Sequence, residues 1–223
     1  MNILTQTADG SNTLFNETIG EHYHSAHGAL QESKHVFIEA GLKHAANLNG
    51  NATVNVLEVG FGTGLNFLLS LAYAEENKIN LNYTGIEAFP LITSVIEGTG
   101  YENYVATPIW QSFAKNYENA LIETQQLLEN CSLFILNEKL EDVNLKEKFD
   151  LLYYDAFSVR HQPEMWTNEI IAHACSFLKP NGIFVSYAIT GHLKRAVKSC
   201  GFSIEKLPGA PGKREMLRAT KIS

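Results

Sequence analysis

A strand-like run that ends in closely spaced glycines constrains this chain more than any other feature. Residues 53–59 (TVNVLEV) predict a buried strand, and Gly60-Phe61-Gly62-Thr63-Gly64-Leu65 follows directly. Glycines let the backbone turn tightly and approach a ligand, and the helix expected from Leu65 would present free N–H groups to it. Leu65 stands where the dinucleotide fingerprint has its third glycine, and the Gly-Lys-Ser/Thr of a phosphate-binding P-loop is absent. The pattern therefore predicts a strand–turn–helix unit for a ligand other than a pyrophosphate.

The full spacing, E-x-G-x-G-x-G with Glu58 as the acid, is typical of S-adenosylmethionine-dependent methyltransferases. That cofactor carries a sulfonium and an ammonium, so Glu58 would accept hydrogen bonds and offset the positive charge. The next predicted strand ends at Glu87, where open α/β sheets place an acid on the ribose hydroxyls. An ordinary turn with a surface glutamate is the alternative. We expect S-adenosylmethionine as the cofactor, contacted by Gly60, Gly62, Gly64, Glu58 and Glu87.

Strand-like and helix-like segments alternate after residue 50, which predicts a mostly parallel sheet with helices on both faces. The last two strands have no helix between them and should form an antiparallel hairpin at one edge. We expect an α/β, Rossmann-like methyltransferase fold with a seven-stranded sheet. The expected strands are 53–59, 82–87, 132–136, 150–154, 183–187, 202–207 and 215–220, and the expected helices are 29–48, 65–74, 163–178 and 192–200, with a turn at 179–182.

Composition favours one globular domain, since 45% of the residues are hydrophobic and 18% are charged. We expect residues 1–223 to form a single methyltransferase domain, with 1–50 as an N-terminal lid or cap and 51–223 as the core. The three cysteines have no C-x-x-C pairing and predict buried thiols in a reducing cytoplasm. We expect no membrane span and no signal peptide. The spacing His22-x-His24-x-x-His27 lacks a cysteine or acid to complete a metal site, so no metal is expected.

The charge is unevenly distributed along the chain. The net charge is −7, which argues against indiscriminate nucleic-acid coating. From His192 to Ser223, however, eight basic residues face two acidic ones, a net of +6 against −13 for the rest. This stretch is either a local contact for a polyanion or a solvated edge of the fold.

Asp155 is the candidate catalytic residue. It follows the predicted strand 150–154, and ligands in this architecture bind outside the carboxyl ends of the strands. Methyl transfer to an amine needs a neutral nitrogen, and a carboxylate can accept its N–H and orient its lone pair. We expect Asp155 to face the cofactor's methyl group; a helix-capping aspartate is the alternative.

Further strings extend over most of the chain: DGSxTL (9–14), YHSxxGA (23–29), ESxHVF (32–37), GFGTGLNF (60–67), DAFS (155–158), PEMWT (163–167) and GKREML (212–217). With them the chain resembles the methyltransferase component of the bacterial tRNA 5-methylaminomethyl-2-thiouridine biosynthesis enzyme. The resemblance implies methyl transfer from S-adenosylmethionine to the aminomethyl group of the wobble uridine in the tRNA anticodon loop, with Asp155 matching the family's catalytic aspartate.

The resemblance also implies further contacts. Tyr23, Ser25 and Glu32 would form a lid over the cofactor. Phe157 or Trp166 would stack on the wobble base, with core packing as the alternative for Trp166. Phosphates flanking that base would bind basic residues of the C-terminal stretch, namely Lys194, Arg195, Lys213 and Arg214.

The chain departs from the family pattern in places. The best-known members carry a fused flavin-dependent oxidase, for which 223 residues leave no room, so we expect only the last methylation, with a separate enzyme supplying the aminomethyl intermediate. Glu138-Lys139 replaces the usual Gly-Asp, so the adenine amine would meet Glu138 or, alternatively, Asn137. The alternative function is an alkyl transferase acting on a small free amine, such as a polyamine-forming aminopropyltransferase.

Overall fold

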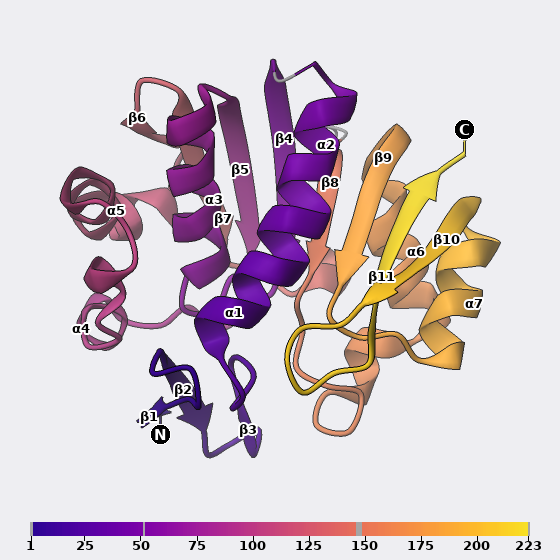
Figure 1. Ribbon diagram of the computed structural model, residues 1–223, viewed down its shortest axis with the longest axis horizontal. Coiled ribbons are helices and arrows are strands. Elements are labelled where there is room, and N and C mark those ends of the chain that lie inside the picture. Colours follow the sequence, from indigo (N-terminus) through magenta and orange to yellow (C-terminus); the bar gives the residue numbers. More distant parts are fainter. Residues whose placement is uncertain (1, 51, 146–148, 223) are drawn as a thin grey trace.

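The computed structural model describes residues 2–50, 52–145 and 149–222, so the expected domain boundary at Asn51 and the ends Met1 and Ser223 lie outside the described residues. The described strands form a central eight-stranded sheet in the order β10-β11-β9-β8-β4-β5-β7-β6 and a separate three-stranded sheet, β1-β2-β3. Figure 1 shows the central sheet between helices, with the small sheet below one of its ends.

The parallel part of the sheet confirms the alternation predicted from the sequence. Its middle strand is β4, which pairs with β5 and β8, and β7 and β9 extend it on either side. In β4, Val54 and Val56 pack in one apolar cluster while Leu57 and Val59 pack in another, because helices cover both faces. The five strands are β4 (Thr53–Val59), β5 (Asn80–Ile86), β7 (Cys131–Leu136), β8 (Phe149–Tyr154) and β9 (Leu178–Ser186).

The helices divide between the two faces of the sheet (Figure 1). The face of Val54 and Val56 is covered by α3 (Leu65–Asn77), α5 (Thr107–Ala120) and a continuous helix made of α1 (Ala29–Ser33), a π-helical segment (Lys34–Leu42) and α2 (Lys43–Leu48). The other face is covered by α6 (Asn168–Ser176) and α7 (Gly191–Ser199). Shorter helical elements are α4 (Thr93–Glu97) and three 3₁₀ turns, Tyr101–Asn103, Leu140–Asp142 and Pro163–Trp166.

Both edges of the sheet are antiparallel, and one of them was not expected. The predicted C-terminal hairpin is confirmed as β10 (Phe202–Pro208) and β11 (Glu215–Lys221), which joins β9. On the far edge, β6 (Gln125–Leu128) pairs with β7 and raises the number of described strands to eight, so the expectation of seven was wrong. Strand β6 is short and irregular, and the Gln126 side chain donates to the backbone of Leu128. Its sequence, two glutamines followed by two leucines, lacks the alternation of apolar and polar residues by which a strand is recognised.

Two boundaries near the end of the chain also differ from the prediction. The expected turn at 179–182 lies inside β9, where Asn181 takes a φ of +64° and the pairing with β8 shifts register. A Pro–Asn–Gly sequence can therefore form an irregularity within a strand as well as a turn. The expected helix 163–178 is split at Thr167, whose hydroxyl accepts the N–H of Ile170 and caps α6.

Residues 2–50 contain two structures. Residues 2–28 contain β1 (Asn2–Gln6), β2 (Asn12–Asn16) and β3 (Glu21–His22), which the sequence did not predict. The helix of residues 29–48 instead packs on the main sheet. Gly41 permits this close approach, because a Cβ there would lie 3.0 Å from the Tyr153 ring. Only the first part of the segment is therefore available to cover the end of the sheet.

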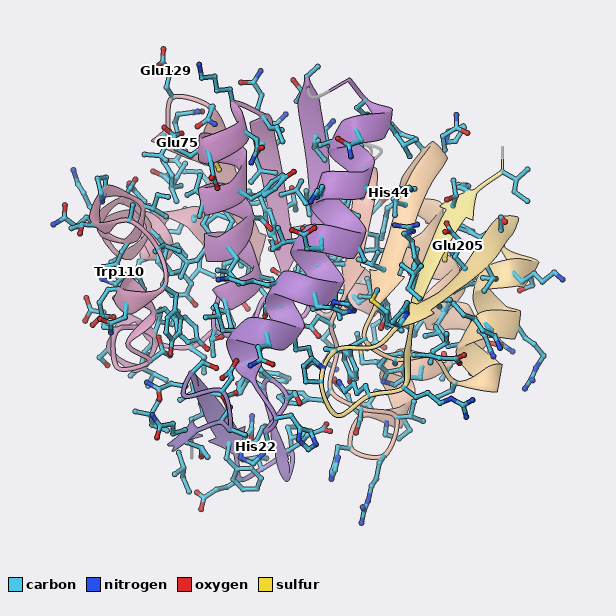
Figure 2. All side chains as sticks on the ribbon, viewed as in Figure 1. His22, His44, Glu75, Trp110, Glu129 and Glu205 are labelled. Atoms are coloured by element: carbon cyan, nitrogen blue, oxygen red, sulfur yellow. The ribbon has the colours of Figure 1, made fainter. Side chains whose placement is uncertain are left out.

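The ends of the sheet can be distinguished in Figure 2, where His22 of β3 is labelled at one end and Glu75 and Glu129 at the other. The end near His22 is the one at which β4, β5 and β8 finish, and the chemistry predicted from the sequence lies there. Among the described helices, none combines the length and the apolar character needed to cross a membrane.

Candidate active site

The glycine turn after β4 takes a backbone conformation that other residues would strain. Gly60, Gly62 and Gly64 have φ values of +85°, +52° and +77°. A Cβ at Gly60 would lie 2.5 Å from the carbonyl oxygen of Asp155, and one at Gly62 would lie 2.9 Å from the Tyr23 ring. The turn therefore needs glycine both for its conformation and for the close approach of its neighbours.

Glu87 is fixed against this turn immediately after β5. Its Oε2 accepts the N–H of Gly62 at 2.9 Å, and its Oε1 accepts the N–H of Phe89 at 3.0 Å. Burial raises the pKa of this carboxyl, and the two N–H bonds act in the opposite direction. Each oxygen keeps a lone pair, so the carboxylate can still accept hydroxyl groups from a ligand.

Asp155 lies on the other side of the glycine turn from Glu87, one residue after β8. Its backbone N–H bonds Val59 at 2.9 Å, and its Oδ2 accepts the side-chain N–H of Asn66 at 2.8 Å. Burial and then the negative charge of Glu32 raise the pKa of Asp155 to about 7, opposed by Asn66 and by the positive charge of Lys213. A carboxyl that titrates near neutral pH is suited to exchange a proton or a hydrogen bond with an amine.

A cavity of about 620 Å³ opens beside the glycine turn, Glu87 and Asp155. Many of the residues expected at the site line it together: Tyr23, Gly60, Gly62, Glu87, Glu138, Asp155 and Phe157. The rings of Tyr23 and Phe157 meet edge to face with centroids 5.1 Å apart, so the small N-terminal sheet and the loop after β8 close one side together.

Glu58 is not where the sequence suggested. Its side chain is fully buried, its two oxygens accept Asn66 and Tyr83, and it is not part of the cavity lining. The reason is the alternation of β4, in which Glu58 shares the face of Val54 and Val56 under α3. The expectation that Glu58 faces the ligand is therefore corrected: it lies beneath the glycine turn. Gly64 likewise lies outside the lining, as the N-cap of α3.

Ser25, Glu32 and Lys213 form a cluster behind the cavity wall. Glu32 accepts the N–H of Ser25 at 3.2 Å and forms an ion pair with Lys213, whose ammonium also lies 3.9 Å from the centre of the Tyr187 ring. Lys213 is thus paired with a carboxylate, and its expected contact with a phosphate stays a prediction. Next to it, Gly212 packs so tightly that a Cβ would lie 2.3 Å from the His27 ring, so the β10–β11 loop is joined to the N-terminal segment.

Trp166 belongs to the core, as the alternative interpretation held. It is 2% exposed, donates its indole N–H to the carbonyl of Phe157 at 2.8 Å and contacts the Tyr154 ring. It therefore supports the loop of Phe157 and cannot stack on a base. The three remaining basic candidates do not line the cavity: Lys194 is half-buried on α7, and Arg195 and Arg214 are exposed.

The structure adds residues that sequence reasoning missed. His24 lines the cavity and lies 3.3 Å from the Thr13 hydroxyl, and burial lowers its pKa to about 4, so it is neutral at pH 7. Phe89 lines the mouth with its side chain largely exposed. Asn66 contacts Asp155 from the first turn of α3. The string GFGTGLNF contained Asn66, but nothing in its spacing singled that residue out.

The cavity favours a cationic ligand. Five acids line it (Glu87, Glu138, Glu141, Asp155 and Glu164) against one lysine, Lys139. Within the part of the chain that the structure describes, no group of three His, Cys, Asp or Glu side chains could hold a metal ion. Of the cysteines, Cys131 and Cys175 are buried and Cys200 is partly exposed, all as free thiols.

These features fit the expected cofactor. The volume lies within the range of small-molecule sites, and a fixed carboxylate on one wall suits ribose hydroxyls. The acidic lining suits a ligand that carries a sulfonium and an ammonium. The exposed Glu138 lines the same cavity, whereas the alternative residue Asn137 does not.

Comparison with known proteins gives a consistent result. Residues 104–222 match the model of a family described as S-adenosyl-L-methionine-dependent methyltransferase. The chain is 27% identical over 215 residues to the tRNA 5-methylaminomethyl-2-thiouridine biosynthesis bifunctional protein MnmC of Ectopseudomonas mendocina, covering 89% of this chain and 32% of that protein. The protein of the same name from Leptospira interrogans is 28% identical over 214 residues, covering 92% and 33%. The chain thus spans about a third of the length of these curated relatives.

Solved structures support the fold. The crystal structure of MNMC2 from Aquifex aeolicus has a TM-score of 0.77 and 25% identity, covering all of this chain and 72% of that one. TrmN from Thermus thermophilus has a TM-score of 0.50 at 12% identity and covers 81% of this chain, a likeness in fold. The expected Rossmann-like methyltransferase fold is confirmed, apart from its strand count.

Proposed function

Since this chain belongs to the S-adenosyl-L-methionine-dependent methyltransferases, we propose that it methylates the 5-aminomethyl group of the wobble (2-thio)uridine in tRNA, giving 5-methylaminomethyl-2-thiouridine. The observation that carries the proposal is the place of Asp155, which lines the cavity beside the glycine turn and titrates near neutral pH. The names of the curated relatives supply the substrate class.

Asp155 supplies what an amine acceptor needs. When bound, S-adenosylmethionine provides an electrophilic methyl group on a sulfonium. The ionised carboxylate of Asp155 accepts an N–H of the neutral amine, which directs the nitrogen lone pair away from Asp155 and into the cavity. The same carboxylate can take the proton that the amine loses after it has been methylated, because its pKa is near 7.

The glycine turn and two acidic residues of the cavity hold the cofactor. In this proposal Glu87 accepts the ribose hydroxyls, Glu138 contacts the adenine amine, and the backbone at Gly60 and Gly62 allows close approach. Tyr23 covers the glycine turn from the N-terminal segment, since its ring is in contact with Gly62. Ser25 and Glu32 support this cover through their mutual hydrogen bond rather than by lining the cavity.

The tRNA would be recognised mainly outside the cavity. The cavity is acidic, so phosphates are excluded from it and must be met by surface cations, for which Lys194, Arg195, Lys213 and Arg214 remain candidates. Phe157 lines the cavity and is half-buried, so it can stack on a base turned out of the anticodon loop. A separate enzyme supplying the aminomethyl group is part of this proposal, as is a cytoplasmic location, where tRNA is modified.

The alternative, an alkyl transferase acting on a small free amine, is not favoured. The acidic cavity would suit a polyamine, but the curated relatives that cover about 90% of this chain are named for tRNA modification. The tRNA reaction is therefore the function that we propose.

A direct test is methyl transfer to tRNA. Purified protein and tritiated S-adenosylmethionine are incubated with bulk tRNA from a strain that accumulates the 5-aminomethyl nucleoside, and the tRNA is digested for nucleoside analysis. We expect label in 5-methylaminomethyl-2-thiouridine. Label that persists in the small-molecule fraction after nuclease treatment of the substrate pool, with none in tRNA, would refute the proposal.

A further inference from the structure

A line of buried hydrogen bonds connects the core of the protein to Asp155. Tyr83 donates its hydroxyl to Oε2 of Glu58 at 2.9 Å, and Nδ2 of Asn66 donates to Oε1 of Glu58 at 2.9 Å. The same Nδ2 donates to Oδ2 of Asp155 at 2.8 Å. Both hydrogens of the Asn66 amide are thus shared between two carboxyl groups, of which only Asp155 lines the cavity.

Resting on the proposed function, we propose that Asn66 and Glu58 are positioning residues for methyl transfer: the Asn66 amide holds one oxygen of Asp155, and Glu58 fixes the direction in which that amide faces. Neither residue touches the reacting atoms in this proposal, since Asn66 is 2% exposed and Glu58 is fully buried. Both act through Asp155.

Two carboxyl groups fix the orientation of the Asn66 amide. An asparagine that rotated by half a turn would place its carbonyl oxygen against the two carboxyl oxygens, where it could donate nothing. Asp155 alone would use one amide hydrogen, and Glu58 provides the acceptor for the second. The amide oxygen, Oδ1, is buried without a hydrogen-bond partner among the described residues, so the two donor contacts alone decide the orientation.

The two carboxyl groups each give one oxygen to the Asn66 amide. Burial raises the pKa of Glu58 well above its ordinary range, and Oε1 of this carboxyl accepts the Asn66 amide. Asp155 keeps the N–H bond that favours its ionised form. The bond uses Oδ2, and Oδ1 has no hydrogen bond from the described residues, which leaves it for the substrate amine.

Other charged or titratable groups also face Asp155. Glu32 of α1 raises its pKa and Lys213 of the β10–β11 loop lowers it. Glu58, Tyr83 and Tyr187 are coupled to it electrostatically from β4, β5 and the segment after β9. Because none of these groups replaces an N–H donor to Oδ2, the effect of Asn66 can be isolated.

The test is to titrate the Asp155 carboxyl by ¹³C NMR in the cofactor-free protein, with the resonance assigned by Asp155→Asn. Loss of a charge-assisted hydrogen bond in Asn66→Leu should move the midpoint upward by about one pH unit. The acidic limb of the kcat profile should move in the same direction. Glu58→Leu removes the acceptor that fixes the Asn66 amide, so both readouts should move in the same direction as in Asn66→Leu, and Glu58→Gln, which keeps a side-chain oxygen for Asn66, should restore them.

Controls separate positioning from general damage. Asn116→Leu on α5 removes an amide that bonds only Ser112, and it should leave the Asp155 midpoint unchanged. If Asn66→Leu does not fold, the isosteric Asn66→Asp takes its place and should raise the midpoint at least as far, because it adds a carboxyl beside Oδ2.

Two results would overturn the inference. One is an Asp155 midpoint in the Asn66 variants equal to that of wild type. The other is a tenfold or greater loss of S-adenosylhomocysteine affinity in Glu58→Gln, which would make Glu58 a cofactor ligand. The titration uses no tRNA, so its result is independent of whether tRNA is the substrate.

Discussion

The two walls of the cavity are built in different ways. The wall of the glycine turn and Glu87 comes from residues close together in sequence, and its shape is set by backbone: the φ values of Gly60 and Gly62 and the N–H of Gly62 on Glu87. The covering wall is backed by side chains that join the N-terminal segment to the β10–β11 loop behind the cavity lining, as Glu32 and Lys213 do across 181 residues. The comparison indicates that the first wall defines the ligand's shape and the second tunes charge.

Asp155 stands where the two walls meet, so its substitution should have the largest effect. Asp155→Asn keeps the shape but cannot accept the amine's N–H in the same way or take its proton. We expect single-turnover methyl transfer to fall by about two orders of magnitude or more, with S-adenosylmethionine affinity changed little.

Asp150→Asn at the other end of β8 is the matched control, since Asp150 pairs with Lys179 far from the cavity. It should transfer methyl groups at the wild-type rate. An Asp155→Asn protein within tenfold of wild type would remove Asp155 from the mechanism.

Glu87 tests the backbone-defined wall. Glu87→Ala removes the acceptor of the Gly62 and Phe89 N–H groups and the expected acceptor of ribose hydroxyls. Loss of hydrogen bonds to a charged group should weaken S-adenosylmethionine binding by about 10- to 100-fold, measured by calorimetry. Glu138→Ala, at an exposed position of the same cavity, should cost less. Equal losses would mean that the two carboxylates are interchangeable and that the wall is less specific than described.

The buried carboxylate of Asp155 should lower the stability of the folded protein when it is ionised. Its folded pKa of about 7 lies above its ordinary 3.8, so the unfolded chain ionises first as pH rises. The folded state is therefore not penalised below pH 3.8, is increasingly penalised up to pH 7 and is fully penalised above it. Asp155→Asn removes the penalty, so its melting temperature should exceed that of wild type by several degrees at pH 8 and by little at pH 4. A constant difference at both pH values would contradict this assignment.

The covering wall should give the smallest effects, and they should have opposite signs. Glu32 raises the pKa of Asp155 and Lys213 lowers it. Glu32→Gln should therefore move the acidic limb of the kcat profile to lower pH, and Lys213→Met should move it to higher pH, each with less than about tenfold change in rate at pH 7. Shifts in the same direction, or a large loss of cofactor affinity in both variants, would break the distinction between the walls.

The features of the glycine-turn wall could be predicted from the sequence, whereas the contacts of the covering wall could not. The strand β4 and the start of α3 were predicted from local apolar pattern and glycine spacing, and Glu87 was placed because parallel strands end at one edge. The positions of Glu32 and Lys213 could not be derived locally, since their contact depends on how two distant loops meet. The sequence showed the positive charge of Lys213 but not its partner Glu32.

Glu58 and Trp166 show a different limit. Both lie in motifs that point to the site, and both are buried by the packing of their own elements. For Glu58 the signal was present, because the alternation of β4 puts it on the face of Val54 and Val56. For Trp166 the signal was absent. The sequence predicted one helix over 163–178, whereas the structure divides this segment at Thr167, so the expected helical period gave the wrong direction for the indole.

The contact of Gly212 with the His27 ring has a genetic consequence. A methyl group at position 212 would clash with the His27 ring and would also strain the backbone, whose φ there is +86°. A screen for inactive alleles should therefore recover substitutions at Gly212 whose products fold, accumulate normally and retain every reacting side chain. His27→Ala would remove the clash with the ring but not the backbone strain of a positive φ at position 212, so it should restore such alleles only in part.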